Sequence, residues 1–239
     1  MSTLGPVSVV VPVLAPGPAL AALLRQLAPA GPGEVLLVDG GSAVPPTSGP
    51  GPGVRVLAAP RGRGTQCAVG AEAAQGEWLL FLHADTRLGA GWEAAVRAAL
   101  ADPARAYHFR FALDDPSPQA RRLERAVAWR CRVLALPYGD QGLLIHRGLY
   151  RAVGGFAPLP LMEDVDIIRR LGRKRIAALD AAAVTSAARW RREGWWGRSA
   201  RNLLVLGLWF LGVPPRHLLR LYGRAPPPGE APGNSPPAG

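Results

Sequence analysis

The most constraining feature of this sequence is a regular alternation between short apolar runs and longer segments with helical periodicity. The first run, VSVVVPV at 7–13, is continuously apolar and rich in β-branched residues, which is typical of a strand buried on both faces of a parallel sheet. An Ala/Leu-rich helical segment at 19–27 and a second apolar run, EVLLVD at 34–39, follow it. This order predicts an α/β fold with a mostly parallel, doubly wound sheet flanked by helices.

The same two patterns continue along the chain and predict the remaining elements. Further strands are predicted at 54–58, 77–83, 108–113, 141–145 and 176–179. The run at 108–113 alternates in the manner of an edge or antiparallel strand. Further helices are predicted at 65–75, 92–101, 119–136, 147–153 and 162–171, and a helical region at about 194–222 is broken near 212–215.

The length of the chain favours a single domain. Its 239 residues are enough for one α/β domain with a sizeable core and too few for two ordinary domains with linkers. We expect this domain at 1–224, with the helical region at its C-terminal end. Many of the 29 glycines and 25 prolines gather in turns and in residues 225–239, which cannot bury a core and are expected to form a disordered tail.

The formal net charge of +11 suits nucleic acid, an anionic membrane surface or a phosphorylated substrate alike. No recognisable nucleic-acid-binding module accompanies the charge, so a nucleic acid partner is not expected. The apolar stretch at 203–213, flanked by arginines, is too short to span a bilayer and suits either a core helix or an interfacial helix on anionic lipid. No signal peptide is visible, which predicts a cytoplasmic protein, at the inner face of the membrane if this helix rests on lipid.

Polar residues follow the apolar runs where ligands bind in such sheets, at the carboxyl ends of the strands. Asp39 ends the second predicted strand and Asp85 follows the fourth. Each suits a ligand contact, and each also suits a simple turn residue. Arg61 and Arg63 belong to a glycine loop, RGRG, that leads into a helix and could hold an anion, although solvated arginines are the alternative.

Two further groups of polar residues lie later in the sequence. Glu163 and Asp164 stand where the chain enters a helix, so they suit either favourable N-terminal helix charges or catalytic groups. Asp140 and Gln141 belong to a turn before a predicted strand, and they suit hydrogen bonds to hydroxyl groups or a mere turn.

Five motifs taken together, PRGRGTQ, LLFLHADT, YGDQGLLI, LPLMEDVD and TSAARW, resemble the inverting glycosyltransferases of family 2, which have the GT-A fold. The resemblance covers about residues 7–222 and is strongest to the small bacterial branch called arsenosugar-biosynthesis or radical-SAM/selenodomain-associated transferases. It implies a nucleotide-sugar donor of the uridine type, a small-molecule acceptor and a bound Mg²⁺ or Mn²⁺ ion.

The resemblance also assigns roles to individual residues. It implies that Asp85 binds the metal, although His83 stands where the family usually has a second carboxylate. It implies that Asp164 is the base that deprotonates the acceptor and that Glu163 supports the acceptor's geometry. The implied nucleotide-binding residues are Pro12, Asp39, Arg61, Arg63 and Ala84, and the implied acceptor-binding residues are Asp140, Gln141, Arg189 and Trp190.

Two other functions are consistent with the sequence. One is a nucleotide-sugar-binding or membrane-associated partner protein without turnover, because Ala15, Pro16 and His83 depart from the family pattern. The other is a sugar nucleotidyltransferase, since a similar sheet can bind nucleoside triphosphates. Two features argue against a nucleotidyltransferase. The Glu163-Asp164 pair lies late in the sequence, and the chain lacks an early glycine-rich signature with a lysine.

Overall fold

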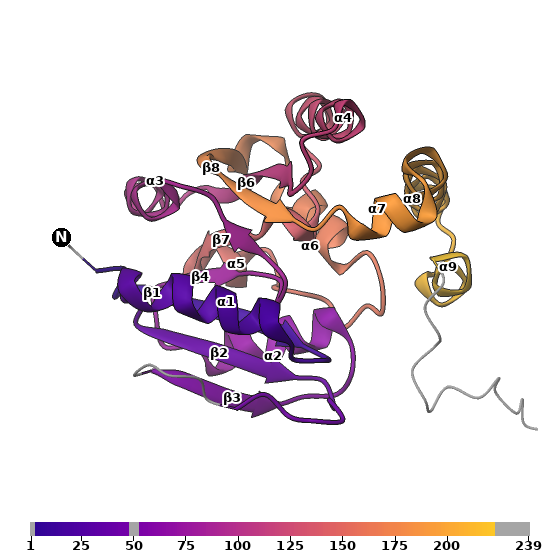
Figure 1. The fold of residues 1–239 in the computed structure, drawn as a ribbon. Helices are drawn as coiled ribbons and strands as arrows, with labels where there is room; N and C mark the ends of the chain where they lie inside the picture. The colour runs from indigo at the N-terminus through magenta and orange to yellow at the C-terminus, as the bar shows by residue number, and fades with distance from the viewer. Residues whose placement is uncertain (1–2, 48–52, 223–239) are drawn as a thin grey trace, which may run out of the picture.

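The computed structural model describes residues 3–47 and 53–222, and the predicted tail at 225–239 lies outside them. Within these residues the chain forms one sheet in the order β3-β2-β1-β4-β7-β6-β8-β5 (Figure 1). Its strands are β1 (Val7–Val13), β2 (Glu34–Asp39), β3 (Val54–Ala58), β4 (Trp78–Phe81), β5 (Arg87–Leu88), β6 (Ala106–Leu113), β7 (Leu143–His146) and β8 (Ile176–Thr185).

Helices cover both faces of the sheet, and a helical region follows the last strand (Figure 1). The α-helices are α1 (Pro18–Leu27), α2 (Arg63–Ala73), α3 (Trp92–Ala99), α4 (Pro118–Leu134), α5 (Arg147–Ala152), α6 (Glu163–Leu171), α7 (Ala188–Glu193), α8 (Trp195–Phe210) and α9 (Pro215–Tyr222). Three short 3₁₀ turns are η1 (Ala28–Ala30), η2 (Gly139–Gln141) and η3 (Arg173–Arg175). No helix in the described ranges is both long enough and apolar enough to cross a membrane.

The central strand β1 shows why its sequence is continuously apolar. Val9 and Val11 point into the core layer under α1 and α3, whereas Val10 points into the layer under α2, α5 and α6. All three side chains are fully buried. A strand covered on both faces has no polar side, so alternation is absent.

One half of the sheet matches the predicted parallel arrangement. β3, β2, β1 and β4 are hydrogen-bonded in that order and all run parallel. The carboxyl ends of β1, β2 and β4 therefore meet at one edge, where the segments after Val13, Asp39 and Phe81 lie close together.

The other half of the sheet is mixed in direction. β7 is antiparallel to both β4 and β6, β8 is parallel to β6, and β5 is antiparallel to β8. The strand predicted at 108–113 as an edge or antiparallel strand is β6, which pairs antiparallel with β7 and parallel with β8 and lies between them instead of at an edge. Its polar residue Arg110 sits at an irregularity in the β6–β8 register, and its side chain is 62% exposed, so a charge is tolerated on this interior strand.

Candidate active site

A buried glutamine joins the strand ends at the predicted ligand edge. The side-chain Nε2 of Gln66 donates to the carbonyl oxygens of Val13 at 2.8 Å and Val38 at 2.7 Å. A Cβ atom added to Gly40 would lie 3.0 Å from the Gln66 amide, so the loop after β2 needs a glycine at this close approach. Gln66 fixes where the loops after β1 and β2 begin. This role was not predicted from the sequence, although Gln66 lies in the PRGRGTQ motif.

Asp39 uses one carboxylate oxygen locally. Its Oδ1 accepts a hydrogen bond from the backbone N–H of Ser42 at 3.0 Å and another from the Ser42 hydroxyl. The turn alternative therefore describes its local geometry, and the predicted nucleotide contact of Asp39 stays a prediction.

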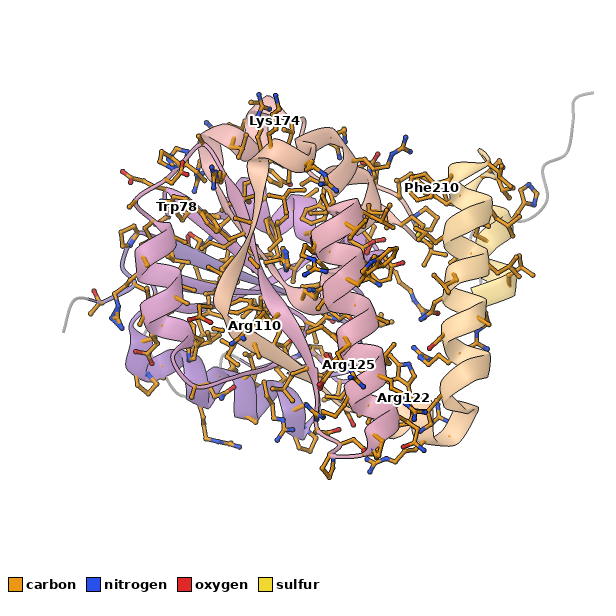
Figure 2. The ribbon with its side chains drawn as sticks, turned by 90° about the horizontal axis from the view of Figure 1, so that it is seen from above. Trp78, Arg110, Arg122, Arg125, Lys174 and Phe210 are labelled. Atoms are coloured by element: carbon orange, nitrogen blue, oxygen red, sulfur yellow. The ribbon has the colours of Figure 1, made fainter. Side chains whose placement is uncertain are left out.

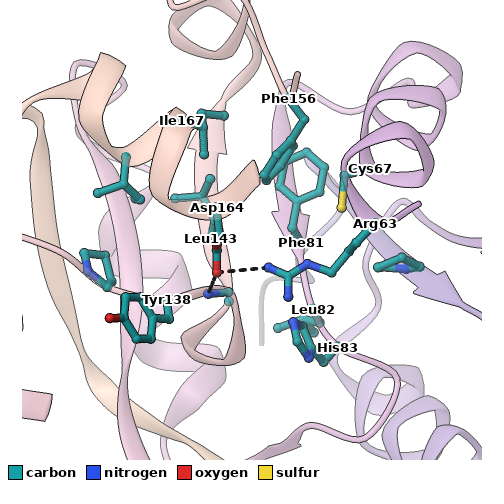
Figure 3. A pocket seen from close by; sticks show the side chains of 15 residues that line it. Arg63, Cys67, Phe81, Leu82, His83, Tyr138, Leu143, Phe156, Asp164 and Ile167 are labelled. Atoms are coloured by element: carbon teal, nitrogen blue, oxygen red, sulfur yellow. Dashed lines mark hydrogen bonds and ion pairs between the residues drawn. The ribbon is translucent and has the colours of Figure 1, made fainter. Parts of the chain in front are cut away.

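A pocket opens next to these strand ends, between α2, α6, β4 and the turn before β7 (Figure 3). Its wall combines residues from the predicted nucleotide half and the predicted acceptor half of the chain, which are far apart in the sequence. Pro12, Arg63 and His83 come from the predicted nucleotide half, and Tyr138 and Asp164 come from the predicted acceptor half. Phe81, Phe156 and Ile167 supply apolar wall.

Arg63 holds both predicted catalytic carboxylates. Its Nε lies 2.6 Å from Oε1 of Glu163. Figure 3 shows its second contact, in which a terminal guanidinium nitrogen lies 3.3 Å from Oδ2 of Asp164. The same Asp164 oxygen accepts a hydrogen bond from the backbone N–H of Gly139 at 2.7 Å. Burial alone would lower the pKa of Arg63, but the neighbouring carboxylates of Glu163 and Asp164 outweigh burial. The net effect raises this pKa above its ordinary value, so the guanidinium is always charged. Asp164 is thereby fixed in place at the pocket wall.

Glycines allow this close packing. A Cβ atom on Gly64 would lie 2.3 Å from the carbonyl oxygen of Ala157, and one on Gly139 would lie 1.7 Å from a guanidinium nitrogen of Arg63. Met162, directly before the carboxylate pair, has a left-handed backbone with φ of 67°. A side chain rarely adopts that conformation without tertiary support, and such residues gather at functional sites.

Asp140 lies beside this arrangement in an unusual environment. Burial raises its pKa to about 6; Arg130 and Arg63 oppose the shift, whereas Asp164 adds to it. Its Oδ1 has no hydrogen-bond partner among the described residues. Asp140 therefore gives up its proton close to neutral pH, unlike an ordinary surface aspartate.

Gln141, predicted to bind the acceptor, is only 1% exposed and is occupied by internal hydrogen bonds. Its Nε2 donates to the carbonyl oxygen of Phe109 at 3.0 Å. Its Oε1 accepts from Arg130 and from the backbone N–H of Tyr138, each at 3.2 Å. Gln141 thus holds the turn that presents Gly139 to Asp164.

Trp190, also predicted to bind the acceptor, is buried away from the residues that line the pocket. Its ring packs edge-on against Phe111 at 6.2 Å and under the guanidinium of Arg198 at 4.9 Å. Arg189 lies on α7, and its side chain is outside the described part of the structure. The predicted acceptor contact of Arg189 stays a prediction, and Trp190 is not among the described residues that line the pocket.

The predicted metal ligand Asp85 lies in the loop after β4, with its side chain 55% exposed. Its Oδ1 is 3.9 Å from Nδ1 of His83, so a carboxylate oxygen and an imidazole nitrogen lie close together. The described ranges hold no cluster of three His, Cys, Asp or Glu side chains that could bind a metal alone. Two donors of this kind fit Mn²⁺ or Mg²⁺ only when phosphate oxygens and water complete the shell. Of the remaining predicted nucleotide residues, Ala84 lies between these two donors and Arg61 is exposed.

Comparisons with known proteins identify the fold. No family model and no curated protein sequence matches this chain. Among solved structures it is similar to residues 1–349 of TarS from S. aureus, with a TM-score of 0.57 and 15% identity over 90% of this chain and 69% of that one. It is also similar to the mannosyltransferase PcManGT from Pyrobaculum calidifontis in complex with GDP-Man and Mn²⁺, with a TM-score of 0.56 and 18% identity over 83% of this chain.

A third similar structure is glucosyl-3-phosphoglycerate synthase from Mycobacterium tuberculosis in complex with Mn²⁺, UDP and glucosyl-3-phosphoglycerate. Its TM-score is 0.52, with 19% identity over 75% of this chain and 70% of that one. This chain spans 61% of the mannosyltransferase and 39% of the longer TarS chain. At these identities the likeness concerns the fold, and the predicted GT-A fold is confirmed.

Proposed function

We propose that this protein is a metal-dependent inverting glycosyltransferase that moves a sugar from a nucleotide-sugar, of the uridine type, to a small acceptor. One observation carries the proposal: a single pocket joins Pro12, Arg63 and His83 at the strand ends with Asp164 on α6. In open α/β sheets, ligands bind beyond the carboxyl ends of the strands. When a hydroxyl group directly displaces a diphosphate, a base must remove the proton of that hydroxyl, and a carboxylate at the same pocket wall can do this.

In the proposed reaction Asp164 accepts the proton of the acceptor hydroxyl. The acceptor oxygen then forms a bond to the anomeric carbon while the bond from that carbon to the diphosphate oxygen breaks, and the electron pair leaves with the diphosphate. Because attack and departure occur on opposite faces, the anomeric configuration inverts. The hydrogen bond from Gly139 and the ion pair with Arg63 hold Asp164 still, which favours a fixed attack geometry.

Arg63 has two tasks in this proposal. Its positive charge pairs with both Glu163 and Asp164, and Glu163 fixes the orientation of the guanidinium. The guanidinium also lines the pocket, where it can donate a hydrogen bond to the diphosphate of the donor. Gln141 is proposed as a positioning residue, since its amide is buried in the turn that carries Gly139.

Asp85 and His83 are the residues that would hold the metal ion. A divalent cation at this place neutralises charge that develops on the leaving diphosphate. Solved structures of the same fold were obtained with Mn²⁺ and a guanosine or uridine nucleotide, which supports this part of the proposal. Membership of the arsenosugar branch stays a prediction.

The test is a panel of nucleotide-sugars assayed with Mn²⁺, with Mg²⁺ and with chelator, in the presence of small hydroxyl-bearing acceptors. We expect release of nucleoside diphosphate that needs both metal and acceptor, and a product of inverted anomeric configuration. A product of retained configuration would refute the inverting mechanism. Donor binding without turnover across the panel would support the partner-protein alternative, and pyrophosphate release from a nucleoside triphosphate and a sugar phosphate would indicate a nucleotidyltransferase.

A further inference from the structure

The outward face of α8 is apolar. Leu203, Leu204, Phe210 and Leu211 are exposed by 62%, 55%, 47% and 82%, respectively. Gly207 between them is also exposed. These positions follow the three- and four-residue spacing of one helix face, so they form a continuous stripe about 12 Å long at 1.5 Å per residue.

The polar residues of the same helix do not share this face. Arg198 is only 8% exposed and covers the ring of Trp190, and Arg201 and Asn202 are half-buried. A helix on the surface of a protein in water normally turns its charged residues outward. The exposed face of α8 is therefore apolar, and its arginines lie on other faces.

Packing explains why α8 stays attached in this orientation. Val205 and Leu206 are buried, and Val205 packs with Leu161 and with Leu218 of α9. Leu161 lies two positions before Glu163, so the α8–α9 pair rests on the loop that carries the candidate catalytic carboxylates. Leu221 at the end of α9 is 48% exposed and adds to the apolar surface of this pair.

A basic segment borders the apolar stripe. Residues 169–175, RRLGRKR, hold five basic side chains, of which only Arg170 pairs with an acidic neighbour, Asp166, in the described structure. The guanidinium of Arg169 lies 5.1 Å from the ring centre of Phe210, which places the segment against the end of α8. Figure 2 shows Lys174 and Phe210 towards the same end of the molecule.

The same basic segment reaches the C-terminal end of α4. Arg173 donates a hydrogen bond to the carbonyl oxygen of Val133. Val133, Leu134 and Trp129 of α4 are exposed by 38%, 49% and 53%, respectively. The surface thus consists of the exposed apolar residues of α8, the basic segment that contacts Phe210, and the end of α4 that the same segment contacts.

We propose that this surface, which we call the α8 face, docks the protein on an anionic phospholipid bilayer. Apolar side chains beside a cluster of four or more basic ones match the interior and the headgroups of such a membrane. The stripe is too short to cross the roughly 30 Å hydrocarbon core, so it lies in the interface. A second copy of the chain would bring two basic segments together, which charge repulsion disfavours. The proposal does not depend on the transferase activity.

Co-sedimentation of the full chain with vesicles tests the proposal. We expect the protein to pellet with vesicles of phosphatidylcholine mixed with phosphatidylglycerol, to pellet less as salt is raised, and to stay in the supernatant with phosphatidylcholine alone. Absence of binding to the anionic vesicles at low salt would refute the proposal.

Matched variants separate the α8 face from general charge. Leu211→Glu should weaken partitioning by more than about tenfold, whereas Val44→Glu, 73% exposed in the loop after β2, should not. Lys174→Glu removes one positive charge and adds one negative charge, and each of these changes should weaken partitioning by about fivefold. Arg25 is an exposed arginine of α1, and Arg25→Glu should have a smaller effect. Each variant's fold is checked by its circular dichroism and melting temperature.

Two results would overturn the assignment. Equal losses for Leu211→Glu and Val44→Glu would mean that the binding is not made by this face. A concentration-dependent dimer in sedimentation velocity without vesicles, abolished by Leu211→Glu, would assign the face to a second copy of the chain.

Discussion

The Nε atom of Arg63 lies 2.6 Å from a carboxylate oxygen of Glu163, although the two residues belong to distant parts of the sequence. Arg63 begins α2, directly after the loop that follows β3, and Glu163 begins α6. This ion pair joins the nucleotide half of the fold to the acceptor half. Glu163 is only 4% exposed, so its charge needs this partner.

Arg63→Ala should therefore destabilise the protein. Removing the cation takes this ion-pair partner from the buried Glu163 carboxylate, and losing one member of a buried pair costs about 3 kcal/mol or more. Urea unfolding monitored by fluorescence measures the free energy of unfolding. Arg61→Ala, two positions earlier and exposed, is the matched control and should change it by less than about 0.5 kcal/mol. Equal effects of the two substitutions would show that the pair contributes little.

Gly64→Ala should also destabilise the protein, because its Cβ would lie 2.3 Å from a backbone oxygen that cannot move aside cheaply. We expect a loss of about 1–3 kcal/mol from overpacking. Gly207→Ala is the control, since no heavy atom lies within 4 Å of its Cβ position and alanine favours helix by about 0.5–1 kcal/mol. In urea unfolding, the free energy of unfolding should decrease for Gly64→Ala and increase for Gly207→Ala. A stabilised Gly64→Ala protein would contradict the close packing of α2 against residues 157–159.

How far the sequence predicts the fold depends on how local each signal is. β1 is predicted within its observed bounds because each of its valines enters one of two packed layers. β8 extends to Thr185 instead of ending near 179, because pairing with β6 overrides the weak strand preference of Asp180 and the alanines after it. The two-residue strand β5 has too little local pattern to be predicted and is set by its pairing with β8.

The same distinction applies to the candidate site. Motifs indicated Arg63 and Asp164 separately, but only the structure brings them to 3.3 Å from each other. The roles of Gln66 and Gln141 rest on hydrogen bonds to distant backbone atoms, which no local pattern encodes. For Gln141 the burial of the amide favours a positioning role over the predicted acceptor contact.

The raised pKa of Asp140 predicts a pH dependence of stability. Burial raises this pKa from 3.8 to about 6 in the folded state, so folding favours the protonated form. The stability that it contributes is fully present below about pH 4 and is lost as the pH rises through about 6. Asp140→Asn has no charge to bury and so does not lose this stability. The melting temperature of the variant minus that of the parent should therefore increase as the pH rises from about 4 to about 6. A relative decrease would show that pairing with Arg130 outweighs the burial of the charge.

The proposed metal site predicts linked binding. A nucleoside diphosphate should raise the melting temperature only with Mn²⁺ or Mg²⁺ present, because Asp85 and the diphosphate share one ion. At about a hundredfold excess over the dissociation constant the stabilisation is roughly 2.7 kcal/mol. Asp85→Ala should abolish the metal effect, whereas Asp102→Ala, another partly exposed aspartate, should preserve it. Equal stabilisation in chelator would contradict the shared site.

The most direct test of the proposed mechanism compares Asp164→Asn with Asp166→Asn, two aspartates at the start of the same helix. Asp166 pairs with Arg170 and does not line the pocket, so its substitution controls for helix charge. Sugar transfer is measured as nucleoside diphosphate release with acceptor, and donor affinity is measured by calorimetry with Mn²⁺. We predict that Asp164→Asn reduces transfer by about 10²–10⁴-fold with donor affinity almost unchanged, and that Asp166→Asn transfers at nearly the parent rate. Transfer by Asp164→Asn at the parent rate would contradict the assignment of Asp164 as the base.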